Sequence, residues 1–341
     1  MTYPTHPDEL TAAWLSDALG KTVTDFRVEL FGEGAGIIGM VTRVHLTGDN
    51  THDTIIAKFP SPAPENRAVA ATYDMYGREY KFYTTISDTV SVRVPECYFA
   101  AFNADEQKFV ILMEDLVGWR IGDQVTGCDA ADAERVIQGI AKLHASSWQT
   151  SADLVSHNNP AQCAGMIGGF GVGWPVVNEQ FPDLIPAPAK DIADKVPDKV
   201  QWLLDQMTQG PICISHADVR LDNIFFKQDE IALVDWQSVC TSAPEQDLAY
   251  FVTQSLATEV RQSQDWVALY HQALSEQGVT DYALDTCRER FRLSAAYLLC
   301  YATIISGTLD LANERGIQLG RTLFGNAMAS LEELDAFSLF N

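Results

Sequence analysis

The sequence predicts an α+β protein with two lobes, a small lobe built on an antiparallel sheet and a larger lobe that is mainly helical. Two observations predict this class. Short runs that alternate apolar and polar residues, or are rich in β-branched residues, fill the first third of the chain, whereas longer runs with helical spacing fill the last third. We place the boundary after residue 116, with residues 1–116 in the first lobe and residues 117–341 in the second.

The charge and the cysteines limit the partners and the compartment. The formal net charge of −23 disfavours nucleic acid and anionic membranes, because their phosphates would be repelled. No apolar run approaches the ~20 residues that span a bilayer, and the start, MTYPTHPDEL, lacks the regions of a secretion signal. The seven cysteines include no C-x-x-C pair, which favours reduced thiols in a cytoplasm. We therefore expect a cytoplasmic protein with small-molecule ligands.

The stretch LFGEGAGIIGMVTRVHL contains a G-x-G-x-x-G at Gly34, Gly36 and Gly39. This spacing occurs in the strand–turn–helix of dinucleotide-binding folds and in the strand–loop–strand that covers ATP in kinases. An ordinary hairpin is a third possibility. The alternation in MVTRVHLTG after the glycines indicates a strand, and DFRVELF before them has the same character. The dinucleotide alternative requires a helix at this point, so the pattern favours two antiparallel strands joined by a loop that binds ATP phosphates.

A third predicted strand, TIIAKFP at residues 54–60, contains Lys58. A lysine inside an apolar strand is costly unless its charge is paired. Helical spacing over residues 68–86 places Glu79 on the apolar stripe of a helix, so we expect Glu79 to pair with Lys58. An edge-strand lysine that faces solvent, or Arg78 as the partner of Glu79, are the alternatives. A glycine loop, a strand lysine and an inward glutamate together position ATP phosphates in kinases.

Two further strands, at residues 93–102 and 108–116, complete a five-stranded sheet. The second of them ends in Met113, Glu114 and Leu116. At this crossing between the lobes, backbone groups of these residues would bind the adenine edge.

The run ICISHADVRLDNIFFKQDEIALVDWQSV carries the strongest chemical pattern. Asp218 follows His216 by two residues and precedes Asn223 by five, and Asp235 ends the next apolar strand. An aspartate on such a loop can accept the proton of an attacking hydroxyl, while Asn223 and Asp235 supply the oxygen ligands that Mg²⁺ prefers. His216 is expected to hold the loop rather than to catalyse.

The segments HADVRLDNIFF, ALVDWQ and PEQDLAYF resemble the catalytic region of the aminoglycoside phosphotransferase and choline kinase-like superfamily, and look closest to its ecdysteroid kinase-like branch and the bacterial relatives. The resemblance implies a protein kinase-like two-lobed fold that uses ATP and Mg²⁺. It implies that Asp218 is the catalytic base, that Lys58 with Glu79 binds the ATP phosphates, and that Asp247 steadies the catalytic loop. Ala217 departs from the family's usual glycine, and the absence of an A-P-E segment argues against a protein kinase.

The rest of the second lobe is predicted to be helical apart from one insert. Residues 129–148, 189–209 and four later runs have helical spacing. Residues 155–187 contain several prolines and the glycine-rich run GMIGGFGVGWP, which favours an irregular insert that acts as an acceptor lid, with a mere connecting loop as the alternative.

The sequence thus predicts an ATP-dependent kinase that phosphorylates a hydroxyl of a small molecule, either a lipophilic alcohol or a hydroxy acid. An aminoglycoside-type acceptor is the alternative within the same chemistry. A catalytically silent nucleotide-binding protein on the same fold is the alternative from another class, and a dehydrogenase is a weaker one.

Overall fold

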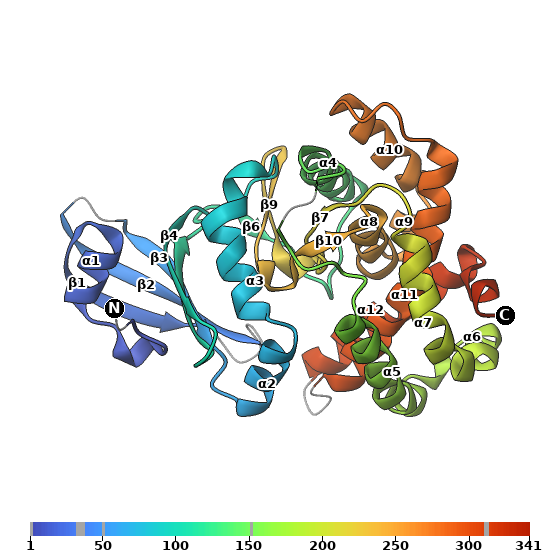
Figure 1. The fold of residues 1–341 in the computed structure, drawn as a ribbon, viewed down its shortest axis with the longest axis horizontal. Helices are drawn as coiled ribbons and strands as arrows, with labels where there is room; N and C mark the ends of the chain where they lie inside the picture. The colour runs from blue at the N-terminus through green and yellow to red at the C-terminus, as the bar shows by residue number, and fades with distance from the viewer. Residues whose placement is uncertain (1–2, 32–37, 50–51, 151–152, 310–313) are drawn as a thin grey trace. The chain divides into compact units, whose positions relative to one another are not determined.

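The computed structural model describes residues 3–31, 38–49, 52–150, 153–309 and 314–341 (Figure 1). Gly34 and Gly36 lie outside these residues. The chain forms two compact units: the first contains residues 1–88, 94–119 and 234–238, and the second contains residues 89–93, 120–233 and 239–341. The domain boundary that we expect after residue 116 remains a prediction. Among the described helices, none is long and apolar enough to cross a bilayer.

The first unit is built on a five-stranded antiparallel sheet in the order β1-β2-β3-β5-β4. The strands are β1 (Thr22–Leu30), β2 (Gly39–Asp49), β3 (Thr54–Pro60), β4 (Cys97–Asn103) and β5 (Lys108–Glu114). All five predicted strands are therefore confirmed. The alternation read in β2 is also correct, since Thr42, Val44 and Leu46 are buried while Arg43 and His45 between them are partly exposed.

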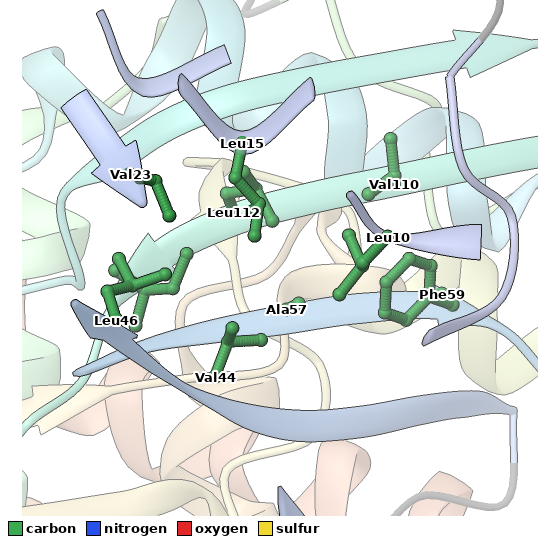
Figure 2. Close-up of a cluster of buried hydrophobic side chains, with 10 residues drawn as sticks. Leu10, Leu15, Val23, Val44, Leu46, Ala57, Phe59, Val110 and Leu112 are labelled. Atoms are coloured by element: carbon green, nitrogen blue, oxygen red, sulfur yellow. The ribbon is translucent and has the colours of Figure 1, made fainter. Parts of the chain in front are cut away.

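One face of this sheet packs against helix α1 (Ala12–Leu19), and Figure 2 shows Leu15 of this helix among the buried side chains of the core. Thr11 caps the start of the helix by accepting from the Trp14 N–H, and Gly20 ends it at φ +61°. The helix buries Leu15 completely against the sheet. The buried residues of this core are Leu10, Leu15, Val23, Val44, Leu46, Ile55, Ala57, Phe59, Val110 and Leu112.

The single helix predicted over residues 68–86 is wrong, because the chain breaks it. It forms α2 (Pro64–Thr72) and α3 (Met75–Lys81), and α3 continues into a π-helical turn, η2 (Phe82–Ile86). Asp74 between the helices adopts φ +51°. A Cβ at Gly77 would lie only 2.3 Å from the Asp74 carboxylate, so the glycine leaves room for this side chain at the break.

The second unit is mainly helical and carries two small sheets, β10-β7 and β6-β8-β9. Its strands are β6 (Arg120–Ile121), β7 (Cys213–Ser215), β8 (Ile224–Lys227), β9 (Glu230–Leu233) and β10 (Cys240–Ser242). Its helices are α4 (Ala130–Ser146), α5 (Pro160–Gln180), α6 (Ala187–Ile192), α7 (Val196–Met207), α8 (Glu245–Tyr250), α9 (Thr258–Arg261), α10 (Trp266–Glu276), α11 (Leu284–Thr308) and α12 (Glu314–Glu333). The helix predicted over residues 189–209 is therefore divided between α6 and α7.

The irregular insert predicted over residues 155–187 is wrong, because most of it is the 21-residue helix α5. Two of its glycines, Gly169 and Gly173, allow close packing against α11. A Cβ at Gly173 would lie 2.6 Å from the Thr303 carbonyl oxygen, and a Cβ at Gly307 would lie 2.6 Å from the Gly173 Cα. Glycine lowers helix propensity, so the composition resembles that of a loop although contacts with α11 stabilise a helix.

The glycines of α5 should respond to alanine in opposite ways. A Cβ at Gly168 or Gly171 would meet nothing within 4 Å, so Gly168→Ala and Gly171→Ala should each stabilise the protein by roughly 0.5–1 kcal/mol through lower backbone entropy. Gly173→Ala should destabilise it by about 1–3 kcal/mol, because the two helices must separate. Urea unfolding of the three variants measures these differences, and a stabilised Gly173→Ala variant would contradict the packing.

Candidate active site

In the first unit, the Lys58 side chain lies between two carboxylates. Its Nζ is 2.8 Å from Glu79 Oε1 and 2.7 Å from Asp235 Oδ1. Lys58 is only 5% exposed and Glu79 is fully buried. The predicted pairing of Lys58 with Glu79 is confirmed. The alternative of an edge-strand lysine is wrong, since β3 is the central strand of the sheet.

Two opposing effects set the charge of Lys58. Burial alone would lower the pKa of Lys58, but the negative charges of Asp235 and Glu79 outweigh burial and raise it. The ammonium group therefore stays charged. Gly39 makes room for the lysine stem, because a Cβ there would lie 3.1 Å from Lys58 Cε.

Asp235 and Trp236 follow the end of strand β9, as the sequence predicts, and Asp235 contacts Lys58. Asp235 adopts φ +66°, a left-handed conformation that is costly for a residue with a side chain. The ring of Trp236 stacks on Phe82 of η2 with centroids 3.8 Å apart. The stacked ring and the ion pair with Lys58 hold the strained backbone in place.

Met113, Glu114 and Leu116 lie at the end of β5, where the adenine edge was predicted to bind. Met113 Sδ accepts from the Tyr83 hydroxyl at 3.7 Å. The Glu114 N–H donates to the Glu96 carbonyl and the Leu116 carbonyl accepts from the Trp119 N–H, so these two backbone groups are engaged within the unit. The adenine-binding role of the three residues stays a prediction.

In the second unit, the loop after β7 brings Asp218 and Asn223 together. The Asn223 amide donates to the Asp218 backbone oxygen at 3.0 Å and to Asp218 Oδ2 at 2.9 Å. Arg220 Nε lies 3.8 Å from the other carboxylate oxygen, Oδ1. His216 is fully buried, and its Nδ1 accepts from the Asp218 N–H at 3.3 Å. His216 thus contacts the loop in the way the sequence predicts.

Asp247 is the anchor of this loop. Its buried carboxylate accepts from Ser215 Oγ and from the backbone N–H groups of His216 and Ala217, each at 2.8 Å. His144 Nε2 lies 3.1 Å from the same carboxylate. Ala217 adopts φ +62°, which explains why glycine would be the easier residue there. The bond from its N–H to Asp247 stabilises the strained turn.

Gln124 also holds the loop, and the sequence analysis missed it. Its side chain is fully buried. Its Oε1 accepts from the Leu221 N–H at 2.9 Å and from Ser255 Oγ at 3.0 Å, while its Nε2 donates to the Gln254 carbonyl at 2.8 Å. Its own N–H donates to Asp222 Oδ1. A lone glutamine in an irregular segment carries no periodic signal, so only the tertiary contacts show its role.

Comparison with protein families identifies the family of this chain. A sequence model described as the phosphotransferase enzyme family, APH, matches residues 41–284. The chain belongs to this family. The predicted resemblance is confirmed at this level, whereas the ecdysteroid kinase-like branch stays a prediction. Comparison with curated proteins found no match.

Several solved structures share the fold of this chain. Choline kinase from Cryptosporidium parvum Iowa II aligns with a TM-score of 0.59 at 11% identity, over 92% of this chain and 91% of that chain. A choline/ethanolamine kinase family protein from Mesorhizobium loti gives 0.55 at 16% identity over 93% of each chain. The GDP complex of wild-type aminoglycoside 2'-phosphotransferase-IIIa gives 0.53 at 15% identity over 89% and 93%. These likenesses confirm the protein kinase-like fold.

Each unit offers one oxygen donor of the kind that a magnesium ion binds. The Asn223 Nδ2 donates to two oxygens of Asp218, so the carbonyl oxygen of the Asn223 side chain is the atom that could bind a metal. The Asp235 carboxylate is partly exposed, and one oxygen contacts Lys58. Within the described residues, no cluster of three or more His, Cys, Asp or Glu could hold a metal. Magnesium commonly takes only one or two protein oxygens beside water and phosphate, so a site with few protein ligands is consistent with it.

The positive charge of Lys58 should stabilise the buried carboxylate of Glu79, so removing this charge should destabilise the protein. Lys58→Met leaves Glu79 buried without its cation, so we expect a loss of about 3 kcal/mol of stability. The double variant Lys58→Met/Glu79→Gln should regain most of that loss, because the only charge left in the cluster is then that of Asp235, which is partly exposed. Urea unfolding at neutral pH compares them. A single variant as stable as the wild type would mean that the pair is hydrated in solution.

The stability contributed by Asp247 should depend on pH in a defined direction. Burial alone would raise the pKa of Asp247, but the hydrogen bond and charge of His144, with His216 and Ser215, outweigh it and lower the pKa. The contribution is therefore complete above the unfolded value of about 3.9 and is lost as pH falls through the lower folded value.

Asp247→Asn should accordingly cost about 2–4 kcal/mol at pH 7, and the difference from wild type should shrink only below about pH 4. Unfolding midpoints at a series of pH values test this, with Ser215→Ala as a control that removes one donor and leaves the carboxylate. A difference that stays constant into acid would contradict the ionised anchor.

Proposed function

We propose that the protein transfers the terminal phosphoryl group of ATP to a hydroxyl of a small molecule. The observation that carries the proposal is the buried Lys58 held by Glu79 and Asp235. A buried charge with two carboxylate partners is costly to maintain for the fold alone, whereas it suits a site that binds phosphates. The family match and the kinase-like fold support the same activity.

Asp218 would act as the general base. Its Oδ2 is hydrogen-bonded by Asn223, so Oδ1 is the oxygen suited to receive the acceptor proton. As that proton leaves, the acceptor oxygen forms a bond to the γ-phosphorus. The bond from the γ-phosphorus to its bridging oxygen breaks, and ADP departs with the electron pair. Lys58 would bind the α- and β-phosphates. Magnesium held by Asn223 and Asp235 would neutralise charge on the phosphates.

We propose a lipophilic alcohol or a hydroxy acid as the acceptor. In the second unit, Ile167 and Val172 of α5 and Ile317 of α12 expose 37%, 67% and 41% of their surfaces. Apolar groups exposed on these helices support an acceptor with an apolar body. The aminoglycoside alternative is favoured by the net charge of −23, which would attract a polycation. A cytoplasmic location and use of ATP rather than GTP remain part of the proposal.

A screen decides the acceptor class. Purified protein with Mg-ATP or Mg-GTP is assayed for nucleoside diphosphate release against a steroid alcohol, a long-chain alcohol, a hydroxy acid, choline, ethanolamine and an aminoglycoside. Mass spectrometry then identifies the phosphate ester. Nucleotide binding without any ester would favour the silent nucleotide-binding protein instead.

Two aspartate variants should separate the base from the metal ligand. Asp218→Asn should lower turnover roughly 10²–10⁴-fold and leave nucleotide affinity nearly unchanged, because Asn223 and Asp235 remain. Asp235→Asn should lose magnesium-dependent nucleotide binding together with turnover. Kinetics and calorimetric titration with Mg-ATP measure both effects. Full turnover of Asp218→Asn would exclude the proposed mechanism.

A further inference from the structure

Tyr250, the last residue of α8, places an unusual hydroxyl in the second unit. The side chain is fully buried, and within the described part of the chain its Oη makes no hydrogen bond of ordinary geometry. Asp247 lies one helical turn earlier on α8 and accepts from the Ala217 N–H, so Tyr250 belongs to the helix that holds the loop carrying Asp218. Burial, and next the negative charge of Asp218, raise the pKa of Tyr250 well above its usual range. The hydroxyl therefore keeps its proton and can act only as a neutral donor toward Asp218.

The backbone at Tyr250 is also unusual. The α-helix ends at this residue and continues as a π-helical turn, η8 (Phe251–Ser255). Single π-helical turns are rare and occur frequently at functional sites. The same turn presents the Gln254 carbonyl to Gln124, which binds the catalytic loop at Leu221. The irregular turn thus follows Tyr250 directly and is tied to the loop that carries Asp218.

The hydroxyl of Tyr250 has no structural benefit that would explain it. A buried hydroxyl without a good partner costs stability, and phenylalanine would keep the ring contact with Tyr301, whose centroid lies 6.0 Å away. Hydrogen bonds within catalytic groups are often long in unliganded proteins and shorten when substrates bind. A donor held beside one carboxylate oxygen would restrict rotation of the carboxylate while Asn223 occupies Oδ2.

We propose that Tyr250 is a positioning residue that donates its hydroxyl proton to the Asp218 carboxylate when the substrates are bound, and so orients the base toward the acceptor hydroxyl. This inference rests on the proposed function of Asp218. It predicts that the hydroxyl costs stability in the free protein and raises turnover, which is the opposite of what a structural hydrogen bond does.

The test compares Tyr250→Phe with wild type and with Tyr297→Phe in the full chain. Tyr297 is the matched control, because its buried hydroxyl lies 2.9 Å from His157 Nε2 and accepts from Gln162 at 3.1 Å. ADP release from Mg-ATP is measured with water as the acceptor and with any acceptor found, together with thermal unfolding. Tyr250→Phe should lower kcat about tenfold with the KM for ATP unchanged within about twofold. Its unfolding midpoint should not fall.

Tyr297→Phe should show the reverse, a lower midpoint with kcat retained. Tyr250→Phe should also cost nothing further in an Asp218→Asn background, because it acts through that carboxylate. An unchanged kcat in Tyr250→Phe, or a loss that adds fully to that of Asp218→Asn, would overturn the inference.

If the wild type releases no ADP, the proposed function fails, and the inference is decided by unfolding alone. The midpoint shifts of Tyr250→Phe and Asp218→Asn are then compared with that of the double variant. Shifts that add would overturn the contact between the two side chains, and shifts that do not add would support it.

Discussion

The ammonium group of Lys58 lies in the interior of the first unit between Glu79 and Asp235, and most of the arrangement around it follows from the need to keep that charge paired. A charge removed from water is tolerated only with close partners. Glu79 requires α3 to point toward the central strand, and Asp235 requires the segment after β9 to return to the sheet. Trp236 then stacks on Phe82 and fixes the segment. One buried cation therefore orders three separate stretches of chain.

In the second unit, a buried negative charge also requires close partners. The buried Asp247 carboxylate is satisfied by donors that belong to the segment leading to Asp218, namely Ser215 and the backbone of His216 and Ala217. Left-handed backbone conformations fall at Asp235, the proposed metal ligand, and at Ala217, the residue before the proposed base Asp218. Such strain persists where surrounding contacts over-determine the conformation. Here the contacts are the bond to Asp247 in one unit and the ion pair with Lys58 in the other.

Features of short range or of fixed spacing could be predicted from the sequence, and features that depend on distant contacts could not. The strands were predictable because alternation in β2 reports directly on which side chains are buried. The pairing of Lys58 with Glu79 followed from the cost of a lone buried charge. The break was not predictable because the left-handed backbone at Asp74 leaves no pattern in the sequence, and the helix α5 was not predictable because its glycines permit a close approach seen only in three dimensions. Gln124 and Tyr250 were missed because a single buried polar residue leaves no pattern.

The negative net charge of the chain is compatible with binding of an anionic nucleotide, because most of the carboxylates can lie far from the bound phosphates. At physiological ionic strength, charges in water are screened beyond roughly 8 Å, so the distant carboxylates behind a net charge of −23 contribute little at a phosphate. The charges close to a phosphate would then be more important, and the proposed site includes two cations, Lys58 in the first unit and Arg220 beside Asp218 in the second. A nucleic acid would instead contact a wide surface and meet the net charge in full. The net charge thus disfavours polyanions and is compatible with the proposed binding of one nucleotide.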